Sequence, residues 1–289
     1  MLQTTSAYQR RKLACRTISS LPFSERLYYA ILRHVTKSLP DKPEAYDLRV
    51  ATAKSVTNAY GCHGAVPIEQ ATFLEFGAGF ALAHPLALRM QGVQQVYALD
   101  LHRNARLDLV NHAIAYMRCG APVSNLDDDL WSKYRIRYIA PADMRATDMA
   151  GATLDCITSV TTMEHIPTSD IPLILTECHR LLKPGGVMLH MIDYTDHYAQ
   201  GTDASLLHFL TIPEEEWKRH NSDILYMNRL RPSEMRRLFA DADFSIVDEE
   251  VKMQPTDPAI LSNLAPQFRE MSHPDLFTEH EILVAKIQA

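Results

Sequence analysis

Two features of the sequence, a glycine-containing turn and a single aspartate, lie where a nucleoside could bind. The first, Glu75-Phe76-Gly77-Ala78-Gly79, closes a short apolar run and precedes a helical pattern. Glycines at such a turn let the backbone bend sharply and let a ligand approach the main chain. The second is Asp100, which ends the next apolar run. A carboxylate about 20 residues after the glycines is placed to accept hydrogen bonds from ribose hydroxyls.

The residues around the glycines indicate which kind of nucleotide is favoured. A dinucleotide-binding turn would read G-x-G-x-x-G/A, and here the sixth position is Leu82. Glu75 also lies two residues before the first glycine, where a carboxylate suits a cationic nucleoside that carries an amino acid. The pattern therefore favours such a nucleoside, and a nicotinamide dinucleotide is the less favoured alternative.

Candidates for proton transfer follow two later apolar runs. His165 follows the first of them, and Asp193 and His197 follow the second. An imidazole can act as a general base near neutral pH. The acids of Asp193-x-x-Asp196-His197 could instead bind a metal ion, but hard cations need more oxygen ligands than this segment supplies. We therefore predict no metal site.

A further polar set could bind a second ligand near these residues. Arginine can clamp a carboxylate or a phosphate with two parallel hydrogen bonds. The alternative is that the arginines lie on the surface where a helix begins, and that Glu164 and His165 only pack. The candidates for this second binding site are Glu164, Tyr194, Tyr226, Asn228, Arg229 and Arg231.

The elements that must position these residues alternate between apolar runs and helical patterns. This alternation predicts an α/β fold, a doubly wound, mostly parallel, Rossmann-like sheet of seven strands, where ligands bind outside the carboxyl ends of the strands. The acidic run Asp127–Asp129 is predicted to be a solvated loop. Strands are predicted at 72–76, 95–99, 135–140, 154–160, 187–192, 244–251 and 281–287, and helices at 81–90, 103–118, 169–182 and 234–240.

Composition excludes several classes of protein. The 289 residues are 46% hydrophobic and 22% charged, which is typical of a globular chain. No run approaches the roughly 20 apolar residues that a membrane-spanning helix needs. The five cysteines are an odd number without a C-x-x-C pair, which argues against a disulfide scaffold. We therefore predict a cytoplasmic protein without a membrane partner, either a monomer or a homodimer.

The N-terminal segment differs in charge from the rest of the chain. Residues 1–60 carry a net charge of +6 and the remainder carries −12. We predict that 1–60 form a helical cap on a domain at 61–289, in which 194–232 is a substrate-binding or lid insertion. The basic, acid-free first 24 residues would also suit an organellar transit peptide. The acidic body argues against a nucleic-acid partner.

Five motifs, in order across residues 72–192, resemble those of the class I S-adenosylmethionine-dependent methyltransferases. The glycine turn is similar to their first motif and Asp100 to their second. Asp143 follows the third predicted strand, residues 154–167 resemble the fourth-strand motif, and 180–186 resemble the turn before the fifth strand. One departure is Ala81, where the family has a third glycine.

This resemblance implies S-adenosyl-L-methionine as cofactor, with S-adenosyl-L-homocysteine as product. It implies transfer of a methyl group to a small polar acceptor, a metabolite or a sugar, at oxygen in the first instance and otherwise at nitrogen or sulfur. The alternatives are a non-catalytic nucleoside-binding or regulatory protein on the same fold and a nicotinamide-dependent oxidoreductase.

The resemblance also assigns roles to single residues. The glycine turn would contact the methionine part, Asp100 the ribose and Asp143 the adenine amine, with Met144 on the ring. Val160 or Thr161 would lie beside the sulfonium. The cofactor-binding candidates are Glu75, Phe76, Gly77, Ala78, Gly79, Asp100, Leu101, Asp143, Met144, Val160 and Thr161, and the catalytic candidates are His165, Asp193 and His197.

Overall fold

A seven-stranded sheet forms the centre of the computed structural model, which describes residues 6–288 apart from the side chain of His220. The strand order is β3-β2-β1-β4-β5-β7-β6, which confirms the predicted architecture. Each predicted strand is present, although several ends differ by a few residues. The strands are β1 (Thr72–Phe76), β2 (Gln95–Leu99), β3 (Ile136–Ile139), β4 (Leu154–Val160), β5 (Leu182–Asp193), β6 (Phe244–Met253) and β7 (Thr278–Ile287).

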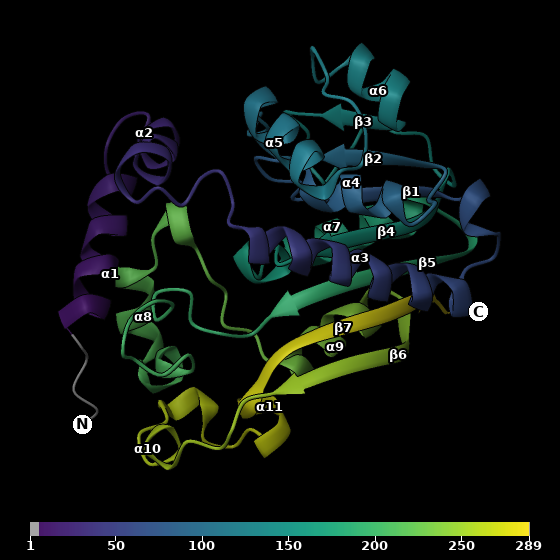
Figure 1. Cartoon of the computed structure of the whole chain (residues 1–289). Helices are drawn as coiled ribbons and strands as arrows, with labels where there is room; N and C mark the ends of the chain where they lie inside the picture. Colours follow the sequence, from purple (N-terminus) through teal and green to yellow (C-terminus); the bar gives the residue numbers. More distant parts are fainter. Residues whose placement is uncertain (1–5, 289) are drawn as a thin grey trace.

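Strand directions determine where ligands can bind. β1 to β5 are parallel, and β7 lies antiparallel between β5 and β6. The strand order reverses between β1 and β4, and a crevice opens at such a switch point beside the carboxyl ends of the strands. In Figure 1 the arrowheads of β2, β3 and β5 point toward the side of the molecule where α1, α2 and α8 lie.

Helices cover both faces of the sheet (Figure 1). One core cluster joins β1 and β2 to α3, α4 and α5, and a second joins β4, β5 and β7 to α7 and α9. α4 begins two residues later than predicted, after Leu82 in the left-handed conformation. The helices of these two layers are α3 (Pro43–His63), α4 (Ala83–Met90), α5 (Leu107–Met117), α7 (Ile171–Leu181) and α9 (Pro232–Asp241).

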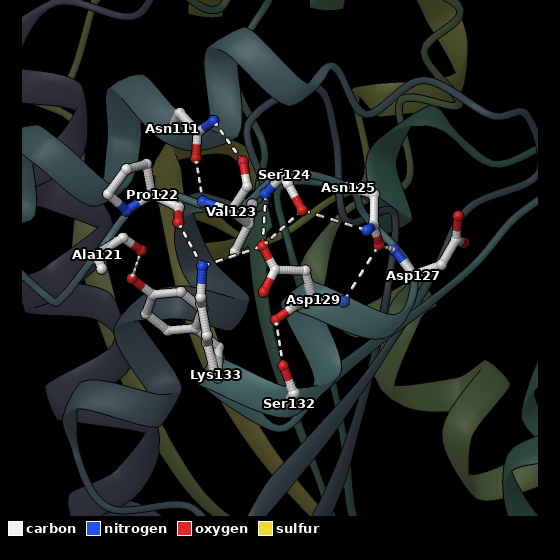
Figure 2. Close-up of polar contacts among 11 residues, drawn as sticks. Asn111, Ala121, Pro122, Val123, Ser124, Asn125, Asp127, Asp129, Ser132 and Lys133 are labelled. Carbon is white, nitrogen blue, oxygen red and sulfur yellow. Dashed lines mark hydrogen bonds and ion pairs between the residues drawn. The ribbon is translucent and has the colours of Figure 1, made fainter.

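The acidic run Asp127–Asp129 leads into a helix, so the prediction of a loop there is wrong in part. α6 (Asp128–Tyr134) begins inside the run. The Asp129 carboxylate accepts hydrogen bonds from the Ser124 amide at 2.6 Å and from its hydroxyl at 2.9 Å, and it pairs with Lys133 (Figure 2). These contacts lower the pKa of Asp129. The helix was missed because seven residues are too few for a clear apolar period.

A third apolar cluster lies outside the two layers and joins the N-terminal helices to the insertion. It includes Tyr8, Phe209, Trp217 and Phe277. The predicted cap therefore falls into two parts: α3 covers the sheet, whereas α1 and α2 pack against segments from 194–232. The elements of this region are α1 (Ser6–Ser19), α2 (Ser24–Ala30), a π-helical turn (Ile31–Val35), α8 (Glu214–His220), α10 (Pro258–Leu261) and α11 (His273–Phe277).

Short 3₁₀ turns complete the described elements, and two of them lie inside the predicted insertion at 194–232. Among residues 6–288, no helix is both long enough and apolar enough to cross a membrane. Residues 1–5 of the predicted cap lie outside the described residues. The 3₁₀ turns are Ile68–Gln70, Met163–His165, His208–Thr211, Asp223–Leu225 and Pro266–Phe268.

Candidate functional site

Two cavities meet at the carboxyl ends of β1, β2 and β4. The first has a volume of about 280 Å³, and the second has a volume of about 290 Å³. Gly77 lines both of them, so the cavities lie on either side of the glycine turn. Most of the residues predicted to contact a nucleoside line one cavity or the other, which shows that the fold brings them together.

The glycine turn is held in a conformation that favours glycine. Gly77 and Gly79 have positive φ values of 75° and 72°. A Cβ atom at Gly77 would lie 2.4 Å from Thr162 Oγ1, whereas one at Gly79 would meet nothing within 4 Å. The amides of Gly77 and Ala78 donate to the Leu99 carbonyl at 2.9 and 3.2 Å. The turn is therefore fixed against β2, and its Gly79 side is open.

A buried carboxylate and a histidine line the first cavity. Glu75 hydrogen-bonds with His84 Nδ1, and both side chains are only 3% exposed. His84 Nε2 has no hydrogen-bond partner in the part of the chain that the structure describes. The cavity therefore offers a negative charge and a free imidazole nitrogen next to the glycine turn.

The N-terminal segment closes the first cavity with two charged residues that the sequence did not indicate. Asp41 and Arg49 line it, and Arg49 Nη1 donates to Thr161 Oγ1 at 3.5 Å. Thr161 follows β4 with a φ of 49°, which is strained for a β-branched residue. Val160 lines the same cavity. No local motif marks Asp41 or Arg49, because only the packing of α3 brings them to the glycine turn.

Asp100 lies between the turn and the second cavity. Its Oδ2 accepts a hydrogen bond from the Gly79 amide at 2.9 Å. Burial raises the pKa of Asp100 to about 6, although the Gly79 amide and His102 act in the opposite direction. Leu101 also lines the second cavity. The Asp100 carboxylate is therefore desolvated, and hydrogen-bond donors stabilise its charged form.

The far wall of the second cavity carries the predicted adenine contacts. Phe76, Asp143 and Met144 line it together with Arg145 and Asp170. Arg145 Nη2 contacts Asp143 at 2.6 Å and lowers its pKa, while Arg145 Nη1 contacts Asp170 at 3.0 Å. An adenine amine would therefore share the Asp143 carboxylate with Arg145.

The catalytic candidates gather after β4 and β5. His197 Nε2 lies 3.1 Å from Asp193 Oδ2, and the His165 and His197 ring centres are 4.8 Å apart. His165 Nδ1 lies 2.6 Å from the main-chain oxygen of Tyr226, and the ring also lines the second cavity. Burial lowers the pKa of His165 to about 4, so this imidazole is neutral near pH 7. The spacing of the two histidines along the sequence did not reveal this contact.

The structure corrects the prediction that Arg231 binds a ligand. Its side chain is fully buried. The guanidinium group donates to the main-chain oxygens of Tyr194, Asp275, Leu276 and Thr278 at 2.7, 2.8, 3.1 and 2.9 Å. Arg231 therefore fastens the end of the insertion to β5 and to the segment before β7, and it has no free edge for a ligand.

Arg229 has a similar structural role. Its Nη1 donates to the main-chain oxygens of Phe209 and Ile212 at 2.8 and 2.7 Å, and Nη2 pairs with Glu214. The guanidinium lies over the Trp217 ring, 4.8 Å from its centre. Both terminal nitrogens of the guanidinium group are therefore bound within the protein. The prediction that Arg229 binds a ligand is corrected as well.

The remaining acceptor candidates divide into structural and available groups. The Tyr194 hydroxyl donates to the buried Glu281 at 3.1 Å, so this side chain belongs to the core. Asn228 Nδ2 donates to the oxygens of Met163 and Ile166 at 2.8 and 3.0 Å and thereby holds the turn after β4. Among the six residues predicted to bind a second ligand, Glu164 and the partly buried Tyr226 have side chains that take no part in these structural hydrogen bonds.

Comparisons with known proteins agree with this geometry. Residues 63–249, more than half of the chain, match the family model described as methyltransferase domain. The PH0226 protein of Pyrococcus horikoshii OT3 is similar in structure, with a TM-score of 0.54 and 14% identity over 89% of this chain and 98% of that one. No curated protein matches the sequence significantly.

Two further solved structures share the fold. A SAM-dependent methyltransferase from Methanosarcina mazei has a TM-score of 0.50 and 14% identity over 76% of this chain and 94% of that one. The [4+2]-cyclase SpnF has a TM-score of 0.50 and 11% identity over 83% of this chain and 82% of that one. Since proteins described by different activities share the fold, the reaction must be argued from family and site.

Sheet order and cavity placement define a Rossmann-like protein of the methyltransferase type. The chain belongs to the methyltransferase-domain family. It is an S-adenosylmethionine-dependent methyltransferase, and S-adenosylmethionine is its cofactor. The nicotinamide-dependent alternative has no support from this family.

Proposed function

We propose that S-adenosylmethionine spans the two cavities and that its methyl group is transferred to a small polar acceptor beside the ends of β4 and β5. The observation that carries this proposal is the open glycine turn, with Glu75 on one side and Asp100 on the other. A Cβ at Gly79 would occupy open space, and His84 Nε2 is unpartnered. These features fit a ligand that contacts the main chain and brings a positive charge.

The cofactor's parts match the chemistry of the cavities. The ammonium group of its methionine part suits Glu75, and its carboxylate suits Arg49, the cation that lines the same cavity. The ribose hydroxyls suit Asp100, and the adenine suits the Met144 wall, with its amine toward Asp143. Phe76, Ala78, Leu101, Val160 and Thr161 complete the proposed contacts.

When bound, the cofactor supplies a methyl group already activated by the sulfonium. The protein's task is to align the acceptor and exclude water, and good alignment can lower the barrier by roughly 7–11 kcal/mol. A hydroxyl acceptor must also lose its proton. We propose that His197, held by Asp193, accepts it, with His165 alongside. Such a base contributes about 10²–10⁴-fold to the rate.

The walls near β4 and β5 support a small, polar acceptor. Glu164, His165, Asp193 and His197 gather there, and the insertion covers them through Tyr226. A metabolite or sugar hydroxyl fits this environment better than a lipid chain does. Oxygen is the favoured acceptor atom because a histidine–aspartate pair serves an acceptor that is protonated at neutral pH.

A screen for S-adenosylhomocysteine formation tests the proposal. Purified protein is incubated with S-adenosylmethionine and small hydroxyl, amine and thiol compounds, and the product is measured by mass spectrometry. We expect one hydroxyl compound to give turnover that His197→Asn lowers by at least about 100-fold. His63→Asn is the matched control, since the partly buried His63 lies 3.1 Å from Asp248 and lines neither cavity. Turnover that is equal in wild type and His197→Asn would contradict base catalysis by His197.

A further inference from the structure

Three potential metal ligands meet after β4 and β5. One ligand atom from each of Glu164, His165 and His197 lies within 4.8 Å of the other two. Glu164 and His165 belong to the 3₁₀ turn after β4, and His197 comes from the loop after β5. The sequence predicted no metal here because it offered only acids near His197. The fold adds a second imidazole and a different carboxylate.

Each histidine has one ring nitrogen bound to a protein oxygen. His165 Nδ1 is 2.6 Å from the main-chain oxygen of Tyr226, and His197 Nε2 is 3.1 Å from Asp193 Oδ2. This arrangement fixes the ring orientation and leaves the other nitrogen of each ring as a lone-pair donor. Metal-binding histidines are oriented in the same way by carbonyl or carboxylate partners.

Glu164 provides the independent sign that a ligand is missing. Its side chain is 3% exposed, and neither carboxylate oxygen has a hydrogen-bond partner among the described residues. Leaving a buried carboxylate unpartnered is costly, and buried charges are normally paired or bound to a metal.

We propose that Glu164, His165 and His197 form a binding site for a divalent first-row transition-metal ion, with Zn²⁺ as the ion that fits best. Two imidazoles and one carboxylate are the ligands of known catalytic zinc sites, which keep one position open. Asp193 is a positioning residue that orients His197. His165 also lines the second cavity, so the open position lies near the proposed acceptor.

The two roles of His197 belong to two states of the protein. In the metal-free protein its imidazole can accept a proton, as proposed above, whereas in the Zn²⁺-bound protein it is a ligand. The binding of the ion does not require S-adenosylmethionine or an acceptor, so it can be measured separately. Failure of methyl transfer and failure of metal binding are therefore distinguishable.

Calorimetric titration with Zn²⁺ tests the proposal on full-length, chelator-treated, untagged protein. We expect one equivalent to bind to wild type. Affinity should fall more than about tenfold in Glu164→Gln and in His197→Gln, and about 10–100-fold in Asp193→Asn, as for other supporting residues. His63→Gln should bind like wild type, because the His63–Asp248 pair has the same 3.1 Å separation but no third ligand among the described residues.

Circular dichroism checks that each variant is folded, and a Co²⁺ spectrum gives a second measurement on wild type alone. Bound Co²⁺ should show visible absorption bands that one equivalent of Zn²⁺ removes. The proposal is overturned if wild type binds no stoichiometric Zn²⁺ and shows no such bands. It is equally overturned if folded Glu164→Gln and His197→Gln both bind Zn²⁺ as tightly as wild type.

Discussion

A single carboxylate, Asp100, connects the two halves of the proposed cofactor site. It accepts the Gly79 amide on one side and lines the second cavity on the other. Hydrogen bonds to a charged group contribute about 1.5–3 kcal/mol each. The ionised form of this carboxylate is therefore expected to matter more for binding than any apolar contact in the site.

Asp100→Asn should weaken S-adenosylmethionine binding by at least about tenfold, because an amide loses the charge and part of the acceptor capacity. Calorimetric titration of both proteins at pH 7.5 measures the difference. Asp241→Asn, at the exposed end of α9, is the control and should bind like wild type. An unchanged affinity in Asp100→Asn would remove Asp100 from the site.

The pH dependence of binding follows from the same group. Burial raises the pKa of Asp100 to about 6 in the free protein, so the carboxylate is ionised above that pH and neutral below it. Because the ligand prefers the ionised form, affinity should be constant above about pH 7 and fall by up to about tenfold per pH unit below pH 6. Titrations from pH 5 to 8 test this. In Asp100→Asn the affinity should not show this fall below pH 6. An identical pH profile in both proteins would contradict a role for Asp100 in binding.

Arg231 illustrates a residue whose role the sequence could not show. Its place in a polar segment before a helix predicted a side chain that binds a ligand. In the structure the guanidinium group is buried and donates to main-chain oxygens of distant segments, and only the tertiary structure brings these segments together. Sequence spacing also could not show that Glu164 lies near His197, or that Asp41 and Arg49 line the same cavity as the glycine turn, because only the tertiary structure brings them together. By contrast, the glycine turn and Asp100 were predictable, because local spacing defines them.

Arg231→Met should lower the free energy of unfolding by at least about 3 kcal/mol, because several buried carbonyl oxygens lose a charged donor. Urea denaturation followed by circular dichroism measures this. Arg237→Met, at an exposed position on α9, the helix that follows Arg231, should stay within about 0.5 kcal/mol of wild type. Equal stability of the two variants would contradict a structural role for Arg231.

At the scale of elements, the strands and central helices were predictable because each shows a strong apolar period. The short α6, α8, α10 and α11 were missed, since four to seven residues give little periodic signal. The N-terminal region was predicted as one cap, but α3 packs on the sheet and α1 packs on the insertion. That division depends on contacts between distant segments, such as the hydrogen bond of 2.9 Å from Tyr8 to the buried Asp196.

Removing residues 1–20 should impair the acceptor side of the site and spare the cofactor side. α1 supports the insertion, whereas the described lining of the two cavities begins at Leu39. S-adenosylmethionine affinity should therefore change little, while turnover falls because the insertion loses its support. Calorimetry and the S-adenosylhomocysteine assay measure the two quantities on protein whose folding is verified by circular dichroism. Full turnover after truncation would favour the transit-peptide interpretation.

At the scale of the whole molecule, the sheet order brings functional side chains from four strands to one edge. β1 and β2 deliver Glu75, the glycine turn and Asp100, and the ends of β4 and β5 deliver the histidines. The N-terminal segment and the insertion then cover this edge. The central claim of the account is that S-adenosylmethionine binds across the glycine turn, between the two cavities.

Equilibrium binding of S-adenosylmethionine to wild type and Gly79→Val tests that claim most directly. A valine there would place its side chain in the open space over the turn and would strain a backbone with a φ of 72°. The account predicts saturable binding of one S-adenosylmethionine to wild type, with affinity lost by more than about tenfold in folded Gly79→Val, and no binding of NADH to either protein. Absence of saturable binding to wild type, or equal affinity in folded Gly79→Val, would contradict it.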